Sequence, residues 1–210
     1  MMKLYDFAMA PNARRVRVFA AEKGLEIEKI SIDLGKREQM QDAYRAVNPR
    51  LAVPALLLDD GTLITESEAI CRYLEELHPQ PPLFGSGPLG KATVTMWHRR
   101  VELEGLQAVA DGARNSIEFF AGRALAGAVD FEQIPALAER GKRRVDLFYD
   151  MLEERLATSE FIAGDDYSIA DICALVACDF AKVLKIRVGD DRAHLKRWHD
   201  AVSARPSASA

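Results

Sequence analysis

The stretch VPALLLDDGTLITESEAI, residues 53–70, decides the fold of this chain. Its apolar run at residues 54–58 is separated from the run at 62–64 by Asp59-Asp60-Gly61, and an Asp-Gly pair favours a tight turn between two antiparallel strands. Residues 66–78 then carry apolar residues at helical spacing. The stretch therefore predicts a β-hairpin followed by an amphipathic helix.

Strand and helix patterns alternate upstream of this hairpin. Strand patterns occupy residues 3–7 and 27–32, and helical patterns occupy residues 11–23 and, more weakly, 37–47. Because a helix separates the first two strands, we expect them to pair in parallel. The order β-α-β-α-β-β-α predicts an α/β domain over residues 1–80, with a small mixed sheet covered by helices.

Strand patterns disappear after the hairpin and its helix. The run PQPPLFGSGPLG at residues 79–90 is rich in Pro and Gly, and we place a linker at 81–90 within it. Residues 91–210 are predicted to form an all-helical bundle, and Gly105, Gly112 and Gly122 should bend or break its first helix. The expected helices cover 91–123, 131–157, 169–184 and 191–204.

Composition excludes several classes of function. The chain has 210 residues, 49% of them hydrophobic, and a net charge of −4, which argues against a dedicated nucleic-acid-binding protein. No apolar run approaches the length of a membrane span. Cys71, Cys173 and Cys178 have neither CxxC pairing nor histidines at metal spacing, so we expect core thiols, no metal and a reducing cytoplasm.

Two short motifs in residues 53–70 suggest binding of a peptide. A cis bond at Val53-Pro54 would turn the N–H and C=O of Val53 outward, where an extended peptide can pair with them; the alternative is a trans proline that opens a strand. Glu66 and Ser67 stand at a helix start and suit the ammonium and carboxylate of an α-amino acid. The alternative there is a capping box, Thr65-x-x-Glu68.

A second capping box, Ser168-x-x-Asp171, precedes an apolar helix and is interpreted as structural. The motifs VPAL, TESEAI and SIADI, in this order, resemble the glutathione S-transferase superfamily over nearly the whole chain. The resemblance implies a thioredoxin-like domain, a C-terminal helical bundle, a cis bond before Pro54, and a homodimer. It also implies glutathione as co-substrate without a further cofactor, and recognition of the γ-glutamyl group by Glu66 and Ser67.

In the family, the turn before the first helix directs a hydrogen-bond donor at the glutathione sulfur. Here the stretch FAMAPNARRV, residues 7–16, is similar to the SPN turn of the Nu class, but Ala10 occupies the usual Ser or Thr position. The donor is then the amide of Asn12, a backbone N–H near Ala10, or Tyr5. Ala52 replaces a basic residue common in relatives, and Gln39, Arg50 or Arg14 can compensate. The expected glutathione site comprises Ala10, Asn12, Gln39, Val53, Pro54, Glu66 and Ser67.

A second-substrate pocket is expected beside the turn. Phe7, Met9, Trp97 and Phe119, with Phe120, are its candidate lining residues, although aromatic residues at helical spacing are more often part of a core. We expect a transferase that conjugates glutathione to a small electrophile. The alternatives are a glutathione-dependent disulfide reductase and a non-catalytic interaction protein that keeps the fold.

Overall fold

The computed structural model describes residues 2–210, and these form two compact units. The N-terminal unit runs to Pro81 and also includes Leu125–Asp130 and Ala210. The C-terminal unit comprises Pro82–Ala124 and Phe131–Ser209. No helix within residues 2–210 is both long enough and apolar enough to cross a membrane.

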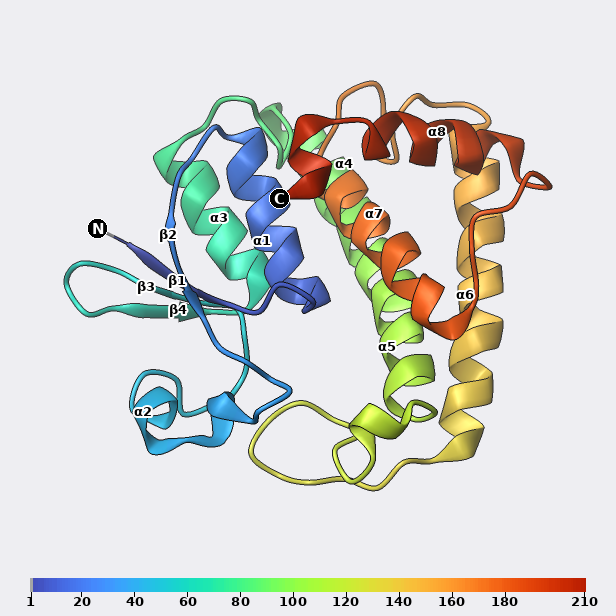
Figure 1. Ribbon diagram of the computed structural model, residues 1–210. Helices are drawn as coiled ribbons and strands as arrows, with labels where there is room; N and C mark the ends of the chain where they lie inside the picture. The colour runs from blue at the N-terminus through green and yellow to red at the C-terminus, as the bar shows by residue number, and fades with distance from the viewer. Residues whose placement is uncertain (1) are drawn as a thin grey trace. The chain divides into compact units, whose positions relative to one another are not determined.

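A mixed four-stranded sheet organises the N-terminal unit (Figure 1). Its order is β2-β1-β3-β4, with β1 parallel to β2 and antiparallel to β3, and β3 antiparallel to β4. The strand order and directions confirm the mixed sheet expected from the sequence. The strands are β1 (Lys3–Asp6), β2 (Glu28–Ser31), β3 (Ala55–Leu57) and β4 (Leu63–Thr65).

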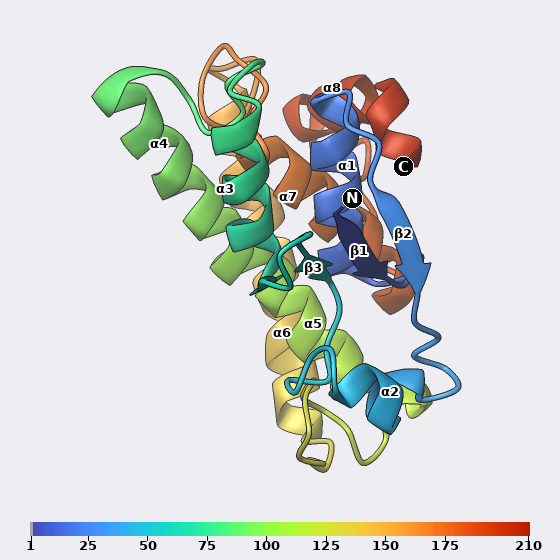
Figure 2. The ribbon, with the colours of Figure 1, turned by 90° about the vertical axis from the view of Figure 1, so that its left-hand side faces the viewer.

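Two helices of this unit, α1 (Pro11–Glu22) and α3 (Ser67–Leu77), lie side by side, as Figures 1 and 2 show. The weak helix expected over residues 37–47 is instead a 3₁₀ turn, η1 (Glu38–Met40), and a single α-turn, α2 (Asp42–Arg45). Gln41 between them has extended backbone angles, which interrupt the helix. That segment contains few apolar residues to bury, so little packing energy supports a longer helix.

The ends of α1 and α3 are joined through the buried Lys23. Its Nζ lies 2.5 Å from Glu75 Oε2 and donates to the carbonyl of His78 at 2.8 Å and to that of Pro81. The ammonium group has three N–H donors, and these contacts give each of them a partner. The hydrogen bonds to His78 and Pro81 fix the chain where it leaves α3.

The C-terminal unit is helical, as expected, but its first helix differs from the prediction. It starts at Gly87, so the last four residues of the expected linker 81–90 are helical; Pro88 suits a first helical turn. A π-helical turn then separates α4 from α5, which ends at Arg114 rather than near residue 123. The helices are α4 (Gly87–Arg100), η2 (Val101–Leu106), α5 (Gln107–Arg114), α6 (Pro135–Leu156), α7 (Ile169–Ala181) and α8 (Ala193–Ser203); the short 3₁₀ turns are η3 (Glu118–Phe120), η4 (Lys182–Leu184) and η5 (Pro206–Ser209).

The first helix is interrupted as expected, because the π-helical turn contains Gly105 and α5 ends two residues after Gly112. These two glycines also allow close packing. A Cβ at Gly105 would lie 2.5 Å from the Phe148 ring, so glycine lets this ring approach the π-helical turn. Gly112 faces Gly141 of α6, where a Cβ would lie 2.5 Å from the Gly112 nitrogen. The absent side chain of Gly141 allows α6 to approach α5 closely, and the absent side chain of Gly112 makes room for Leu184, whose Cδ1 would lie 2.7 Å from a Cβ there.

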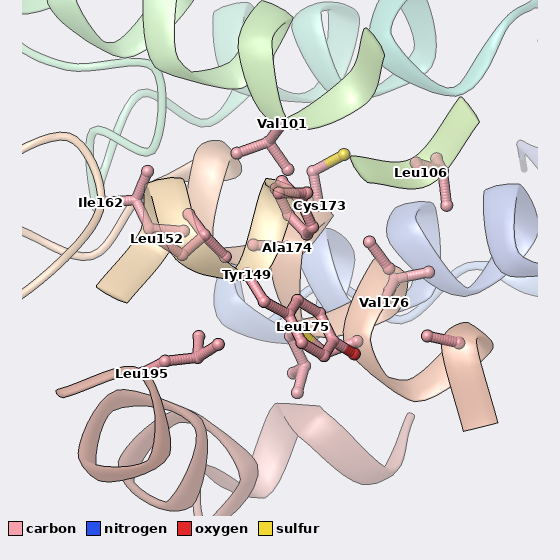
Figure 3. Close-up of a cluster of buried hydrophobic side chains, with 14 of the residues drawn as sticks. Val101, Leu106, Tyr149, Leu152, Ile162, Cys173, Ala174, Leu175, Val176 and Leu195 are labelled. Atoms are coloured by element: carbon pink, nitrogen blue, oxygen red, sulfur yellow. The ribbon is translucent and has the colours of Figure 1, made fainter. Parts of the chain in front are cut away.

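Helix α7 forms the centre of this unit, and eleven of its residues are buried. Figure 3 shows the core that it builds with α6 and the π-helical turn, including Tyr149, Leu152 and Cys173. The capping box predicted at its start is present. Asp171 accepts hydrogen bonds from Ser168 N and Oγ, each at 3.0 Å, from Ile162 N at 3.0 Å, and from Trp198 Nε1 at 2.8 Å.

Full burial raises the pKa of Asp171 to about 6, and the hydrogen bonds from Ile162, Trp198 and Ser168 oppose that rise. The two carboxyl oxygens accept all four bonds, an arrangement that favours the ionised form. The side chain connects the start of α7 to the loop at Ile162 and to Trp198 on α8.

We predict that Asp171→Asn lowers the free energy of unfolding by roughly 2–4 kcal/mol, because an NH₂ group would replace one carboxylate oxygen and leave two buried donors without acceptors. Urea denaturation at pH 7 measures the change. Asp166→Asn is the matched control, since this residue is an exposed aspartate in the same loop. Equal losses in the two variants would contradict the role assigned to Asp171.

Candidate functional site

The turn between β1 and α1 presents an open helix N-terminus. Ala10 is the N-cap, with extended backbone angles of φ −78° and ψ 121°, and its N–H donates to Phe7 O at 2.8 Å. Pro11 follows and has no N–H to lose. Among the described residues no side chain caps this end, so the N–H groups of Asn12 and Ala13 lack helical partners. The turn can therefore receive an anion.

Asn12, a candidate hydrogen-bond donor from the sequence analysis, lies in the first turn of α1. It is exposed, and its Oδ1 accepts a hydrogen bond from Arg15 Nη1 at 3.2 Å, one helical turn later. Tyr5, the other side-chain candidate, lies within β1 opposite Ile30 and Ala55. Its ring packs on Tyr44 with centroids 5.5 Å apart, a contact that favours a packing role for Tyr5.

A buried ion pair below the turn was missed by the sequence analysis. Arg17 Nη1 lies 2.5 Å from Asp6 Oδ1, with side chains 8% and 10% exposed. The same guanidinium donates to Ala8 O at 2.8 Å and to Phe7 O at 3.5 Å. Arginine among the apolar residues of α1 was the available signal, because a charge on a buried helix face needs a partner.

The start of α3 is a second open N-terminus. Glu66 is its N-cap with a positive φ of 68°, and no side-chain capping bond is formed. The capping box Thr65-x-x-Glu68 is therefore absent, and that alternative is wrong. Ser67 begins the helix and is 6% exposed; its hydroxyl has no hydrogen-bond partner within residues 2–210. Positive φ at a residue other than glycine is uncommon and costs about 1 kcal/mol or more.

The Val53–Pro54 peptide bond is cis. It precedes β3, whose pairing with β4 begins at Ala55, so the N–H and C=O of Val53 are not used by the sheet. The chain before it is held firmly, because Ala52 O accepts from Tyr44 Oη at 2.7 Å and from Asn48 Nδ2 at 2.8 Å.

The residues considered as substitutes for a basic side chain at Ala52 differ in their surroundings. Arg50 Nε lies 3.6 Å from Glu66 Oε1, and both side chains are largely exposed. Gln39 lies in η1, and its Oε1 is a buried atom without a hydrogen-bond partner among the described residues. Arg50 therefore stands beside Glu66, whereas Gln39 has an unused acceptor.

The second-substrate candidates come from different units. Phe7 and Met9, which is 83% exposed, belong to the N-terminal unit. Trp97 packs against the core of the C-terminal unit, and the guanidinium groups of Arg100 and Arg155 each lie 5.0 Å from its ring centroid. Phe119 is 46% exposed. A pocket formed by these residues stays a prediction.

The three cysteines are unsuited to act as nucleophiles. Cys71, Cys173 and Cys178 are all buried, and burial raises the pKa of Cys178 to about 12. Within residues 2–210 no group of three or more His, Cys, Asp or Glu side chains is arranged to hold a metal ion. The polar groups described above are thus the chemically useful ones in the N-terminal unit.

Comparisons with known proteins agree with this geometry. Residues 4–82 match the N-terminal domain family of glutathione S-transferases, and residues 117–206 match the C-terminal domain family. Glutathione S-transferase 2 of Saccharomyces cerevisiae is 34% identical over 213 residues, covering 98% of this chain and 87% of the relative. A glutathione S-transferase domain-containing protein of Marinobacter aquaeolei VT8 superposes with a TM-score of 0.90, at 33% identity over 98% of both chains. A Gtt2-class glutathione S-transferase of Vibrio parahaemolyticus gives a TM-score of 0.82 at 36% identity, over 98% of this chain and 94% of the other. The chain belongs to the glutathione S-transferase superfamily and is a glutathione transferase.

Proposed function

We propose that the protein conjugates the thiolate of glutathione to a small electrophile, with glutathione held on the N-terminal unit. The observation that carries the proposal is the uncapped start of α3, where Glu66 and the hydroxyl of Ser67 stand together without a capping bond. A structural role would have used the adjacent Thr65 and Glu68 as a capping box. The Ser67 hydroxyl and the Glu66 carboxylate, which is exposed and has only the surface contact with Arg50 within residues 2–210, suit an amino acid instead.

The binding groups divide by the parts of the tripeptide. The Ser67 hydroxyl and the free N–H groups of α3 donate hydrogen bonds to the γ-glutamyl carboxylate, and the Glu66 carboxylate accepts hydrogen bonds from the γ-glutamyl ammonium. The backbone of Val53 pairs with the extended middle of glutathione as an added strand would. Gln39 and Arg50 are the side chains available for the glycyl end.

The thiol requires a donor, because a free thiol with a pKa near 8.5 is only a few per cent thiolate at neutral pH. Each unit of lowering requires about 1.4 kcal/mol of preferential stabilisation of the anion. The start of α1 supplies the positive end of a helix dipole, and the Asn12 amide supplies one hydrogen bond to the anion. Together these can lower the pKa of the thiol by one to two units, which is roughly 1.4–2.7 kcal/mol.

Disulfide reduction is a second candidate, favoured by the Ala10-Pro11-Asn12 turn, which offers an amide where a hydroxyl is usual. The bound thiolate would attack one sulfur of the substrate, forming a mixed disulfide and releasing the other sulfur as a thiolate. A second glutathione would then attack the mixed disulfide, giving glutathione disulfide and the second substrate thiol. Turnover of an aryl halide against turnover of a small dialkyl disulfide separates the two activities.

We expect Ser67→Ala to raise the KM for glutathione roughly tenfold, the value of one charge-assisted hydrogen bond. Ser86→Ala is the control, because Ser86 also precedes a helix, is exposed and makes no capping bond. Steady-state kinetics with an aryl halide give both values. A KM that stays unchanged in Ser67→Ala would remove this serine from glutathione binding.

Asn12→Ala should raise the thiol pKa of bound glutathione and lower kcat by roughly tenfold or more, while the dissociation constant for glutathione changes little. The physical reason is that the amide bonds the thiolate and not the peptide. Titration of thiolate absorbance in the enzyme–glutathione complex measures the midpoint. Ala10→Ser, which adds a hydroxyl at the same turn, should lower the midpoint. Identical midpoints in wild type and Asn12→Ala would assign activation to backbone N–H groups or Tyr5.

We also propose that the protein is a homodimer, because exposed apolar residues follow α4 and the π-helical turn after it. Leu89 and Met96 are spaced seven residues apart on α4 and are 81% and 44% exposed, so they share one helix face. Leu103, 43% exposed, follows in the π-helical turn. A second copy of this chain is the occupant that we expect.

Light scattering at micromolar concentration should therefore give about twice the chain mass of 23.3 kDa. Met96→Glu with Leu103→Glu should shift the mass to that of a monomer, because a charge would enter the apolar contact. Val183→Glu is the control, since Val183 is a comparably exposed apolar residue on η4. A monomeric mass for the wild type would refute the dimer.

A further inference from the structure

The contact between Arg15 and Asn12 carries information about the direction of the Asn12 amide. Arg15 is only 2% exposed, and its Nη1 lies 3.2 Å from Asn12 Oδ1. A guanidinium has five N–H donors and no acceptor. The Asn12 atom facing Arg15 must therefore be the oxygen, whatever the ambiguity that normally attends an amide side chain.

Because the oxygen of the Asn12 amide faces Arg15, the NH₂ group of that amide must point the other way. With Oδ1 held by Arg15, the NH₂ group is directed away from the guanidinium, and Nδ2 donates to no atom within residues 2–210. A thiolate accepts hydrogen bonds and is repelled by a carbonyl oxygen. Only one of the two amide orientations can stabilise the anion, and Arg15 selects that one.

We propose that Arg15 is a positioning residue, which holds the oxygen of the Asn12 amide so that its NH₂ group serves as the donor to the glutathione thiolate. The inference rests on the proposed role of Asn12 in thiol activation. Asn12 is exposed and rotates about two side-chain bonds, so without a fixed partner it would spend time in orientations that offer no donor. Arg15 is buried and remains charged at any working pH, which makes it a stable anchor.

A purely electrostatic role for Arg15 is the competing explanation, because a buried cation near the sulfur would also favour a thiolate. The two explanations differ in their dependence on Asn12. A positioning residue has no effect on the thiolate once Asn12 is gone, whereas a nearby charge acts whether or not the amide is present. A double-mutant cycle separates them.

The experiment is titration of the thiolate of bound glutathione in the full-length protein. The variants are Asn12→Ala, Arg15→Met, the double variant, and the exposed control Arg140→Met on α6. We expect Arg15→Met to reduce the thiolate fraction below neutral pH about as much as Asn12→Ala, roughly tenfold for a shift of one pKa unit. The double variant should match Asn12→Ala alone, and Arg140→Met should match wild type.

Two results would overturn the inference. Additive shifts in the double variant would show that Arg15 acts independently of the amide, and an Arg15→Met midpoint equal to wild type would show that it does not act at all. In both cases Asn12→Ala still shifts the midpoint, so the proposed role of Asn12 survives. If Asn12→Ala itself has no effect, the proposed thiol activation fails and the inference fails with it.

A second variant covers the case in which Arg15→Met does not fold. Asn12→Asp keeps the shape of the side chain and the contact with Arg15 but replaces the outward NH₂ group by an oxygen. The positioning model expects a thiolate fraction lower than in Asn12→Ala, because a carboxylate oxygen now faces the sulfur. A thiolate fraction equal to wild type in Asn12→Asp would contradict an outward-facing donor.

Discussion

The geometry of the candidate site depends on the buried ion pair between Asp6 and Arg17. A buried charge is tolerated only when its partner and its remaining hydrogen-bonding groups are satisfied, and the Arg17 guanidinium meets this condition by binding Asp6 and the carbonyls of Phe7 and Ala8. The end of β1 and the following loop are thereby tied to the middle of α1. Because Phe7 O also accepts from Ala10 N at 2.8 Å, the turn has little freedom left. The N-terminus of α1 is held in place before any ligand arrives.

The start of α7 differs from the starts of α1 and α3 in how its backbone N–H groups are satisfied. Helix α7 begins with a complete capping box around Asp171, deep in the core of the C-terminal unit. By contrast, α1 and α3 begin with Ala10 and Glu66, and neither has a side-chain cap. A missing cap costs about 1 kcal/mol of helix stability, and Glu66 adds the cost of a positive φ. Helices α4 and α6 also begin without a side-chain cap, so a missing cap alone does not distinguish α1 and α3. The feature that sets α3 apart is the positive φ of Glu66 beside the Ser67 hydroxyl.

Patterns within a short window allowed most of the fold to be predicted. The Asp-Gly turn, the alternation in the strands and the Ser168-x-x-Asp171 box each act through neighbours in sequence, and the structure contains all of them. Two local predictions were wrong, namely the helix over residues 37–47 and the Thr65-x-x-Glu68 capping box. Contacts between distant residues were mostly missed. Gly105 was predicted to bend or break the first helix, and the π-helical turn lies there. Its second role, making room for Phe148 as Gly112 makes room for Leu184, has no local sequence signal. The ion pair of Asp6 with Arg17 spans eleven positions and was missed for the same reason.

At the site, residues near open helix starts were identifiable from sequence, while the direction of the Asn12 amide required its contact with Arg15.

The replacement of a hydroxyl by alanine at position 10 explains why a positioning contact is needed. A serine hydroxyl has one rotatable bond above the backbone and a donor that turns freely toward a sulfur. Asn12 lies beyond Pro11 on the helix, is exposed, and carries a donor and an acceptor on the same planar group. A donor on such a side chain has more rotational freedom and two opposite amide orientations. The free energy gained from the hydrogen bond is therefore partly offset by the conformational entropy lost when the side chain is fixed. An arginine one helical turn away removes both difficulties, because it fixes the rotamer and, of the two amide atoms, can donate only to the oxygen. In the proposed mechanism, the missing hydroxyl at Ala10 and the buried arginine at position 15 are therefore two parts of one arrangement.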